Sequence, residues 1–322
     1  MKLLAISLLL LIQISCQTSR PTIIAHRGLP RLLPEHTLEG VEAAMAYDID
    51  FVEPDVVLTK DLVPIVLHDT HLDTTTNVAK LYPTRKRTDG RYYAIDFKLN
   101  EIKKLSINHR INLKTGQSAF KTRPLIRDSK YTIPTLKEFI QLVLSQNKVH
   151  GKNIGIYPEL KAPKFHRSQK ADITKITHTL LLEYQGELEV IIQCFEDGPL
   201  RRLKKLGSPF KRVQLIGSNS WKINSVDYTK MLTSPGLKEV STYADGIGPW
   251  IPLLFNESFK PNQITSMAQG HGLVVHPYTL RNDSIFKGIS SEKHLLDLLF
   301  NKAHVDGIFT DNVNTTTTLL RY

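Results

Sequence analysis

The chain has 322 residues, of which 41% are hydrophobic and 23% are charged, and its formal net charge is +11. This length excludes a small disulfide-stapled domain and suits one large α/β domain or two ordinary ones. No alternation of aromatic and basic residues is present to indicate nucleic-acid binding, so we expect no nucleic-acid partner.

The first residues, MKLLAISLLLLIQISC, are typical of a secretory signal. A single lysine precedes an apolar stretch that is too short to span a bilayer. Ser15 followed by Cys16 resembles a bacterial lipobox, although Gln13 stands where leucine is usual. We therefore predict a signal peptide over residues 1–16 with Cys16 lipidated, and export to the periplasm or to a lipid-anchored place in the bacterial cell envelope. The alternative is plain cleavage near residues 15–17.

Cys194 is the second of two cysteines. It has no partner if Cys16 is lipidated or removed, so we expect no internal disulfide. Its surroundings, VIIQCF, indicate a buried core thiol.

Nine short apolar runs follow along the chain, each bounded by turn or polar residues. Helical patterns at residues 37–47, 135–146, 173–184 and 291–303 lie between several of them, and such alternation predicts a parallel sheet. The runs are 22–25, 51–58, 63–69, 153–160, 189–195, 212–217, 244–249, 272–279 and 305–311.

The turn LTKDLV between the second and third runs is too short for a crossover helix, so these runs are expected to form a hairpin. The other strands then number eight. The predicted fold is an α/β TIM (β/α)8 barrel with an extra hairpin strand, as one domain over 17–322. An open doubly wound sheet is the alternative.

Residues 71–127 break the strand–helix rhythm, and we interpret them as an inserted subdomain on the face where barrels keep their active sites. The positive charge gathers here: residues 76–130 hold 14 Lys or Arg against 4 Asp or Glu. This excess fits either attraction of anionic substrates or a membrane surface, or a solvated basic face, and both interpretations stay open.

Polar side chains end several of the strands. Glu53 and Asp55 are two residues apart, which places both carboxylates on one face of a strand, and Glu159 adds a third. Crowded carboxylates repel unless a cation lies between them. Oxygen ligands without a Cys/His cluster favour Mg²⁺ or Ca²⁺ over zinc, so we predict one divalent cation at this site.

His26 and His68 each end a strand and are each followed by a charged residue. Two imidazoles near a metal suit acid–base cleavage of an ester, because one can take a proton from the attacking oxygen while the other protonates the leaving oxygen. Arg27 offers a planar fork for a phosphate. Lys161 places a cation at the same mouth of the barrel, where the strand ends meet.

Further candidates are weaker. Glu35 either caps the next helix or lines the mouth. Trp250 either forms a substrate wall or packs, and Asp311 is interpreted as a helix cap. His36, His271 and His276 are the remaining candidates.

The segments IIAHRG, LPEHT, FVEPDVVLTKD, VLHD, PELK and GIFTD together resemble glycerophosphodiester phosphodiesterases. DGRYYAIDF, KNIGIYPELKAP, YADGIGP and VVHPYTLR are similar to the exported bacterial branch of that family, so the resemblance covers the mature chain. One departure is Pro54, which stands between the two acids where a polar residue is usual, and we expect it to be tolerated.

The resemblance implies hydrolysis of glycerophosphodiesters, such as glycerophosphocholine or glycerophosphoethanolamine, to glycerol 3-phosphate and an alcohol. It assigns His26 and His68 to catalysis and Arg27 and Lys161 to substrate binding. Glu53, Asp55 and Glu159 would hold the metal, with Ca²⁺ favoured and Mg²⁺ the alternative. By family convention His26 is the base and His68 the acid.

Two other functions stay open. One is a phospholipase D-like enzyme acting on membrane lipids, which the basic segment would help to dock. The other is a surface lipoprotein with an additional binding role. The sequence does not specify the oligomeric state.

Overall fold

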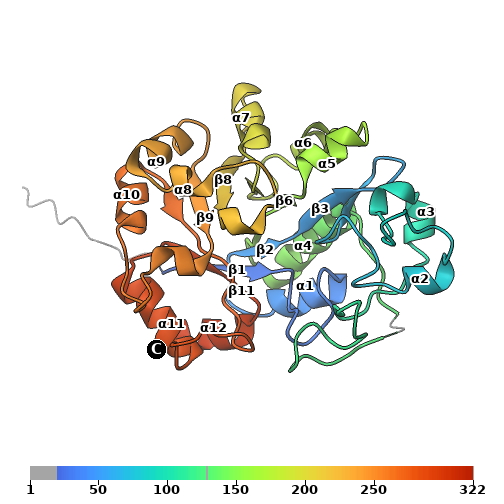
Figure 1. Ribbon diagram of the computed structural model, residues 1–322, viewed down its shortest axis with the longest axis horizontal. Helices are drawn as coiled ribbons and strands as arrows, with labels where there is room; N and C mark the ends of the chain where they lie inside the picture. The colour runs from blue at the N-terminus through green and yellow to red at the C-terminus, as the bar shows by residue number, and fades with distance from the viewer. Residues whose placement is uncertain (1–19, 128–129, 322) are drawn as a thin grey trace, which may run out of the picture.

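The computed structural model describes residues 20–127 and 130–321, so the predicted signal peptide and Cys16 lie outside the described residues. Strands gather at the centre of the described part of the chain, and helices surround them (Figure 1). The strands are β1 (Thr22–His26), β2 (Phe51–Glu53), β3 (Asp55–Leu58), β4 (Pro64–Val66), β5 (Gly155–Ile156), β6 (Glu159–Leu160), β7 (Ile191–Cys194), β8 (Lys211–Ile216), β9 (Gly246–Pro249), β10 (Val274–Val275) and β11 (Gly307–Thr310).

Parallel pairing runs round the barrel in two sheets, ordered β11-β1-β2-β5 and β10-β9-β8-β7-β6-β3-β4. Pro54 interrupts one barrel strand between β2 and β3, and Pro158 interrupts another between β5 and β6. Each of these two strands therefore contributes one segment to each sheet. Backbone hydrogen bonds from Asp306 N to Val275 O and from Phe309 N to Pro277 O, each of 3.0–3.1 Å, join the β10 and β11 segments and close the ring.

Each of the nine predicted runs contains a strand. The predicted hairpin is present, because β3 pairs with β4 in antiparallel register, with Val56 opposite Val66. The eight remaining strand positions form the predicted (β/α)8 barrel, and the open-sheet alternative is wrong.

The helices begin and end where their sequences indicate. In the longest one, Thr135 and Glu138 form a capping box, and Gly151 ends the helix in the left-handed conformation. The helices are α1 (Leu38–Met45), α2 (Val78–Leu81), α3 (Leu99–Ile102), α4 (Leu136–His150), α5 (Pro163–Ser168), α6 (Ile173–Leu182), α7 (Asp197–Lys205), α8 (Tyr228–Met231), α9 (Ser234–Val240), α10 (Ile264–Gly270), α11 (Glu292–Asp297) and α12 (Val313–Leu320), with η1 (Ala94–Asp96), η2 (Asn219–Trp221), η3 (Ile251–Leu254) and η4 (Leu298–Lys302) as shorter or irregular turns.

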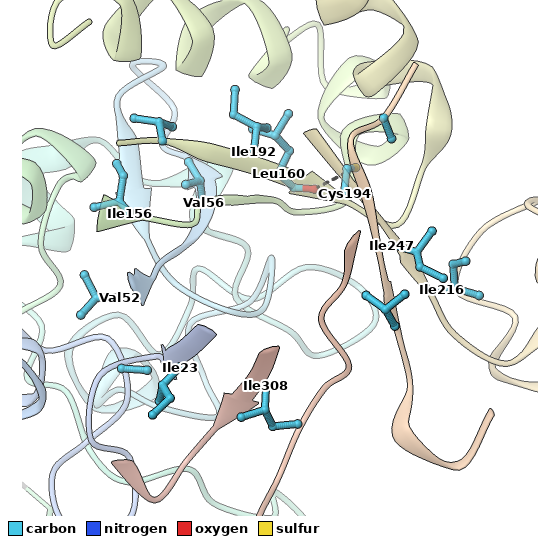
Figure 2. Packing of buried hydrophobic residues seen from close by; sticks show 14 of the residues in the cluster. Ile23, Val52, Val56, Ile156, Leu160, Ile192, Cys194, Ile216, Ile247 and Ile308 are labelled. Atoms are coloured by element: carbon cyan, nitrogen blue, oxygen red, sulfur yellow. Dashed lines mark hydrogen bonds between the residues drawn. The ribbon is translucent and has the colours of Figure 1, made fainter. Parts of the chain in front are cut away.

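Alternate strand residues face two different cores. One set packs outward against the helices, as Ile23, Val56 and Ile192 do in Figure 2. Cys194 belongs to this core; it is buried and free, and its thiol donates a hydrogen bond to Leu160 O at 3.3 Å. The other set fills the barrel and is here called the inner layer: Ile24, Phe51, Tyr157, Ile191, Val213 and Phe309.

Residues 71–127, which we interpreted as an insertion, lie between β4 and α4. In the described residues this segment holds the short elements α2, η1 and α3, and it lies at one side of the barrel (Figure 1). A separate small core supports it, in which Leu72, Phe97 and Leu105 pack against Val57 and Ile65 of the hairpin. None of the helices in the described residues is long and apolar enough to cross a bilayer.

Candidate active site

The inner layer determines which polar residues reach the barrel mouth. Side chains two positions apart on a strand share a face, so the residue two places after each inner-layer residue also faces inward, at the carboxyl end of the strand. Those residues are His26, Glu53, Glu159, Gln193, Leu215 and Asp311.

Three carboxylates meet at this mouth. Glu53, Asp55 and Glu159 are all buried, and each places one oxygen within 4.8 Å of the others. Asp55 and Glu159 are paired in register between β3 and β6. The structure therefore brings together the three residues predicted to hold a metal.

Their electrostatics favour a cation. Burial and the Asp55 carboxylate raise the pKa of Glu53 well above its usual range. Burial also raises the pKa of Glu159 to about 7. Burial opposes ionisation of Asp55 as well, but Lys161 and Arg27 hold its pKa well below the usual range. A divalent cation among these oxygens would relieve the repulsion that otherwise forces protons onto the cluster.

The donor set also fits such an ion. Asp55 Oδ1 is buried and accepts no hydrogen bond from the described residues. Lys161 Nζ lies 2.7 Å from Glu159 Oε1 and 3.4 Å from Asp55 Oδ1, so the predicted cation does stand beside the acids. Carboxylate oxygens are the ligands that hard cations prefer.

Glu53, Asp55 and Glu159 are here called the triad. The Arg27 side chain lies between Asp55 of the triad and Glu35 of the loop that follows β1. Its Nε is 3.2 Å from Asp55 Oδ2, and its Nη1 is 3.3 Å from Glu35 Oε1. Glu35 does not cap α1, because Thr37 does so through its side chain. The Glu35 carboxylate instead binds Arg27 and Arg110.

His26 is held by a carboxylate from the far end of the chain. Its Nδ1 lies 2.6 Å from Asp311 Oδ1. Burial opposes ionisation of Asp311, yet Arg281 and His26 hold its pKa well below the usual range, so the carboxylate accepts and Nδ1 donates. Burial and Arg27 lower the pKa of His26 to about 4. The ring is thus neutral, with its Nε2 available as a base.

The interpretation of Asp311 as a helix cap is wrong. Asn312 precedes α12, and Asp311 points back to the site, where its Oδ2 also accepts from Arg281 Nε at 2.9 Å. The side chain lies inside the mouth because Phe309, two residues earlier, is in the inner layer.

His68 has a matching arrangement. Its Nδ1 lies 2.6 Å from Asp69 Oδ1, and Asp69 Oδ2 accepts from Arg110 and Thr74 at 2.6 and 2.7 Å. Burial and Arg27 lower the pKa of His68 to about 3. Both predicted histidines therefore have one ring nitrogen oriented by a carboxylate.

A cavity of about 610 Å³ opens above these groups. His26, Arg27, Glu53, His68, Glu159 and Lys161 line it, so six of the seven predicted site residues share the cavity, and Asp55 is buried. Aromatic rings form a further part of the cavity wall. Trp250 belongs to this wall, beside Trp221 at 5.1 Å between ring centroids, which agrees with the substrate-wall interpretation.

The other candidates lie elsewhere. His276 is buried in the barrel interior, with Nδ1 3.2 Å from Tyr157 Oη. His271 pairs with Ser234 on the surface. His36 is buried and contacts the site through Asp55, since its Nε2 lies 2.8 Å from Asp55 Oδ2.

Sequence reasoning missed Asp311 as a histidine partner, and it missed Gln193, whose Nε2 is 3.3 Å from Glu53 Oε1. The alternation that follows Phe309 and Ile191 could have identified both. It also missed Arg110, Arg123 and Arg281, which no local pattern marks.

Comparison with known proteins relates most of the chain to one family. The model of the Glycerophosphoryl diester phosphodiesterase family matches residues 26–315. A glycerophosphodiester phosphodiesterase of Haemophilus influenzae is 37% identical, over 90% of this chain and 86% of that protein.

Two solved structures share the fold. A Silicibacter pomeroyi protein, provisionally described as a glycerophosphoryl diester phosphodiesterase, superposes with a TM-score of 0.74 at 21% identity, covering 94% of each chain. An Oleispira antarctica phosphodiesterase, solved in complex with the product sn-glycerol-3-phosphate, gives a TM-score of 0.66 at 21% identity, covering 94% of this chain and 98% of that one.

Proposed function

Because the chain belongs to the glycerophosphoryl diester phosphodiesterase family and is an enzyme of that type, we propose that it hydrolyses glycerophosphodiesters by histidine acid–base catalysis with a divalent cation. The substrates are glycerophosphocholine, glycerophosphoethanolamine and similar diesters, and the products are glycerol 3-phosphate and an alcohol. The observation that carries this proposal is the pair of carboxylate-oriented histidines beside the acidic triad in one cavity.

Arg27 and Lys161 bind the phosphodiester. Both line the cavity, and both already neutralise Asp55, so positive charge is present where the anionic phosphate must lie. Glu53, Asp55 and Glu159 would hold the cation, for which we propose Ca²⁺, with Mg²⁺ as the alternative. When bound, this ion supplies charge that neutralises the phosphate oxygens.

His26 acts as the general base and His68 as the general acid. The lowered pKa of His26, about 4, keeps its imidazole neutral and able to accept the proton of the attacking water or of a neighbouring substrate hydroxyl. His68 donates a proton to the leaving alkoxide. The pKa of His68 is about 3 in the absence of substrate, and the anionic phosphate beside it would raise that pKa.

Release of glycerol 3-phosphate from glycerophosphocholine tests the proposal. The mature protein should turn over this substrate with Ca²⁺ and lose activity with EDTA. His26→Ala and His68→Ala should each reduce kcat by several orders of magnitude, while His271→Ala, on the surface, should leave it unchanged. Activity that survives chelation or His68→Ala would overturn the proposal.

A second candidate substrate is an intact membrane phospholipid, cleaved in the manner of a phospholipase D. The rim of the aromatic wall favours it, because Trp221 and Ile223 line the cavity and are still 38% and 55% exposed. Comparing rates on lysophospholipid or diacyl-phospholipid vesicles with rates on soluble glycerophosphodiesters distinguishes the two. Faster turnover of vesicles would support the lipid substrate.

We also propose that the protein is exported and anchored by a lipid on Cys16, as the leader sequence supports. Labelling of the wild type with a radioactive fatty acid, and loss of the label in Cys16→Ser, would test the anchor. Label-free wild-type protein in the soluble periplasmic fraction would instead support plain cleavage. A binding role at the cell surface remains compatible with either outcome.

A further inference from the structure

Both catalytic histidines depend on one inserted segment, residues 107–127, here called the insertion strap. Each histidine donates from Nδ1 to a carboxylate, and each of those carboxylates accepts from an arginine of the strap. The two arginines are Arg110 and Arg123, and they serve histidines that come from different strands.

Arg110 fixes the His68 side. Its Nη1 donates to Asp69 Oδ2 at 2.6 Å. Its Nη2 and Nε donate to the two oxygens of Glu35 at 2.7 and 3.1 Å, a fork-to-fork pair that fixes the guanidinium plane. Burial opposes ionisation of Asp69, but its bond with His68 and the neighbouring Arg110 hold its pKa well below the usual range. The carboxylate therefore stays an acceptor for His68.

Arg123 fixes the His26 side, although it does not line the main cavity. Its Nη2 donates to Asp311 Oδ2 at 2.5 Å, and its Nε donates to Asp283 at 2.7 Å. The Phe120 ring lies 3.7 Å from its guanidinium carbon. The side chain is only 4% exposed, so the ion pair is well shielded from solvent.

The strap is tied to the residues that follow His68. Ile111 N donates to Thr74 O and Asn108 N to Thr75 O, at 2.9 and 2.7 Å. Ala119 N donates to Arg110 O at 2.9 Å, which folds the strap back so that Arg123 reaches the end of β11. One continuous segment thus spans the mouth from the His68 pair to the His26 pair.

We infer that Arg110 and Arg123 are positioning residues: they hold Asp69 and Asp311 so that each histidine keeps its proton on Nδ1 and presents Nε2 to the substrate. The insertion therefore completes the active site and is more than a basic surface. An ionised carboxylate on Nδ1 sets the tautomer and the ring plane of a catalytic histidine, and an arginine fork fixes the carboxylate in turn. This inference rests on the proposed function for its kinetic test.

Arg123→Gln is the principal variant, because Arg123 lies outside the cavity lining. We expect kcat on glycerophosphocholine to fall at least 10-fold with KM within 2-fold. Arg123→Lys, which keeps the charge but loses the fork, should recover part of the loss. The matched control is Arg91→Gln, which breaks an equally forked pair with Asp73 in the insertion, at 2.8 and 2.8 Å, and should keep kcat within 2-fold.

A double-mutant cycle shows whether Arg123 acts through Asp311. In the Asp311→Asn background, Arg123→Gln should change kcat by less than 2-fold, because the carboxylate that it holds is gone. The inference would be overturned if the kcat reductions of Arg123→Gln and Asp311→Asn multiplied in the double variant. It would also be overturned if Arg123→Gln and Arg91→Gln lowered kcat equally.

Arg110 needs a further distinction, since it lines the cavity. A positioning role predicts that Arg110→Gln lowers kcat with little change in KM and adds little to Asp69→Asn. A rise in KM with unchanged kcat would make it a phosphate ligand and would overturn its part of the inference.

The ¹⁵N resonances of the His26 ring give a readout that needs no activity. Assigned by their loss in His26→Gln, they should show a proton on Nδ1 and a bare Nε2 in the wild type, and a mixture of tautomers in Arg123→Gln and Arg123→Lys. An unchanged tautomer in both variants would overturn the inference. If the wild type hydrolyses no diester, the proposed function fails, whereas this measurement still decides the role of Arg123.

Discussion

His26 Nδ1 lies 2.6 Å from Asp311 Oδ1, although the two residues are 285 positions apart. The contact exists because the barrel closes: β1 pairs with β11 in parallel register, with Ala25 opposite Thr310. The next residue on each strand then reaches the mouth. The first and last strands of the barrel thus bring this histidine and this carboxylate together at the mouth.

Replacement of Asp311 by asparagine should disable this pair. An amide can donate to Nδ1 and so favour the wrong tautomer of His26, and it also leaves Arg123 and Arg281 without their common carboxylate. We expect kcat to fall by about 10²–10⁴-fold. Asp306→Asn is the control, because Asp306 precedes the same strand at the opposite end of the barrel, where it accepts from Val275 N. Retention of more than half of the activity by Asp311→Asn would contradict this assignment.

Cation binding should require the triad and no other acid of the cavity. Calorimetric titration of the apo protein with Ca²⁺ should give one site, and Asp55→Asn should weaken its affinity at least 10-fold, because it removes both charge and a ligand oxygen. Glu196→Gln provides the comparison, since Glu196 lines the cavity outside the triad. Equal weakening by the two substitutions would indicate a general charge effect.

His36 should tune this affinity without taking part in catalysis. Its Nε2 orients Asp55 Oδ2 at 2.8 Å, and partners of metal-ligating carboxylates commonly contribute about 10–100-fold in affinity. We expect His36→Phe to weaken Ca²⁺ binding by about 10-fold, while kcat at saturating Ca²⁺ stays close to that of the wild type. His166→Phe removes an equally buried histidine, 1% exposed, from outside the cavity and should leave the affinity unchanged.

The close approach of Gly28 to α1 predicts a large stability effect. Gly28 has a φ of +85°, and a Cβ here would lie 2.8 Å from Gly40 C and 2.9 Å from Val41 N. Gly28→Ala should reduce the free energy of unfolding by about 2–4 kcal/mol, measured by urea denaturation. Gly198→Ala, in α7, meets no atom within 4 Å and should be neutral or slightly stabilising.

The elements of the fold that could be predicted were those that depend on local periodicity in the sequence. Apolar runs located the strands, and the short turn after Leu58 identified the hairpin. The two-residue spacing of Glu53 and Asp55 placed their carboxylates together, because alternation along a strand depends only on backbone geometry. Asp311 obeyed the same rule but was assigned to a helix cap, since its partner His26 is distant in sequence.

The arginines were beyond such reasoning for a physical reason. Arg110 and Arg123 lie in a segment without regular secondary structure, 75 and 188 residues from the acids Glu35 and Asp311 that they bind. Their positions follow from the path of the insertion strap across the mouth. In the sequence they were part of the basic excess of residues 76–130, which described their charge but not their partners.

Buried neutral histidines should make the fold sensitive to acid. Burial lowers the pKa of His276 from 6.5 to about 4, and this outweighs the opposite pull of Asp306. Below pH 6.5 the unfolded chain binds a proton at this position that the folded chain does not, so stability falls as the pH drops from 6.5 towards 4 and changes no further below that. The loss from one such group is on the order of 3 kcal/mol.

Urea denaturation at pH values from 7 to 4.5 measures this dependence. His276→Phe cannot bind the proton, so its free energy of unfolding should decline less steeply with acid than that of the wild type, whatever its value at pH 7. His271→Phe alters a surface histidine and should keep the wild-type slope. If His276→Phe kept that slope as well, the acid sensitivity would have to come from other groups. His166 would then be the next to replace, because burial lowers its pKa to about 4 also.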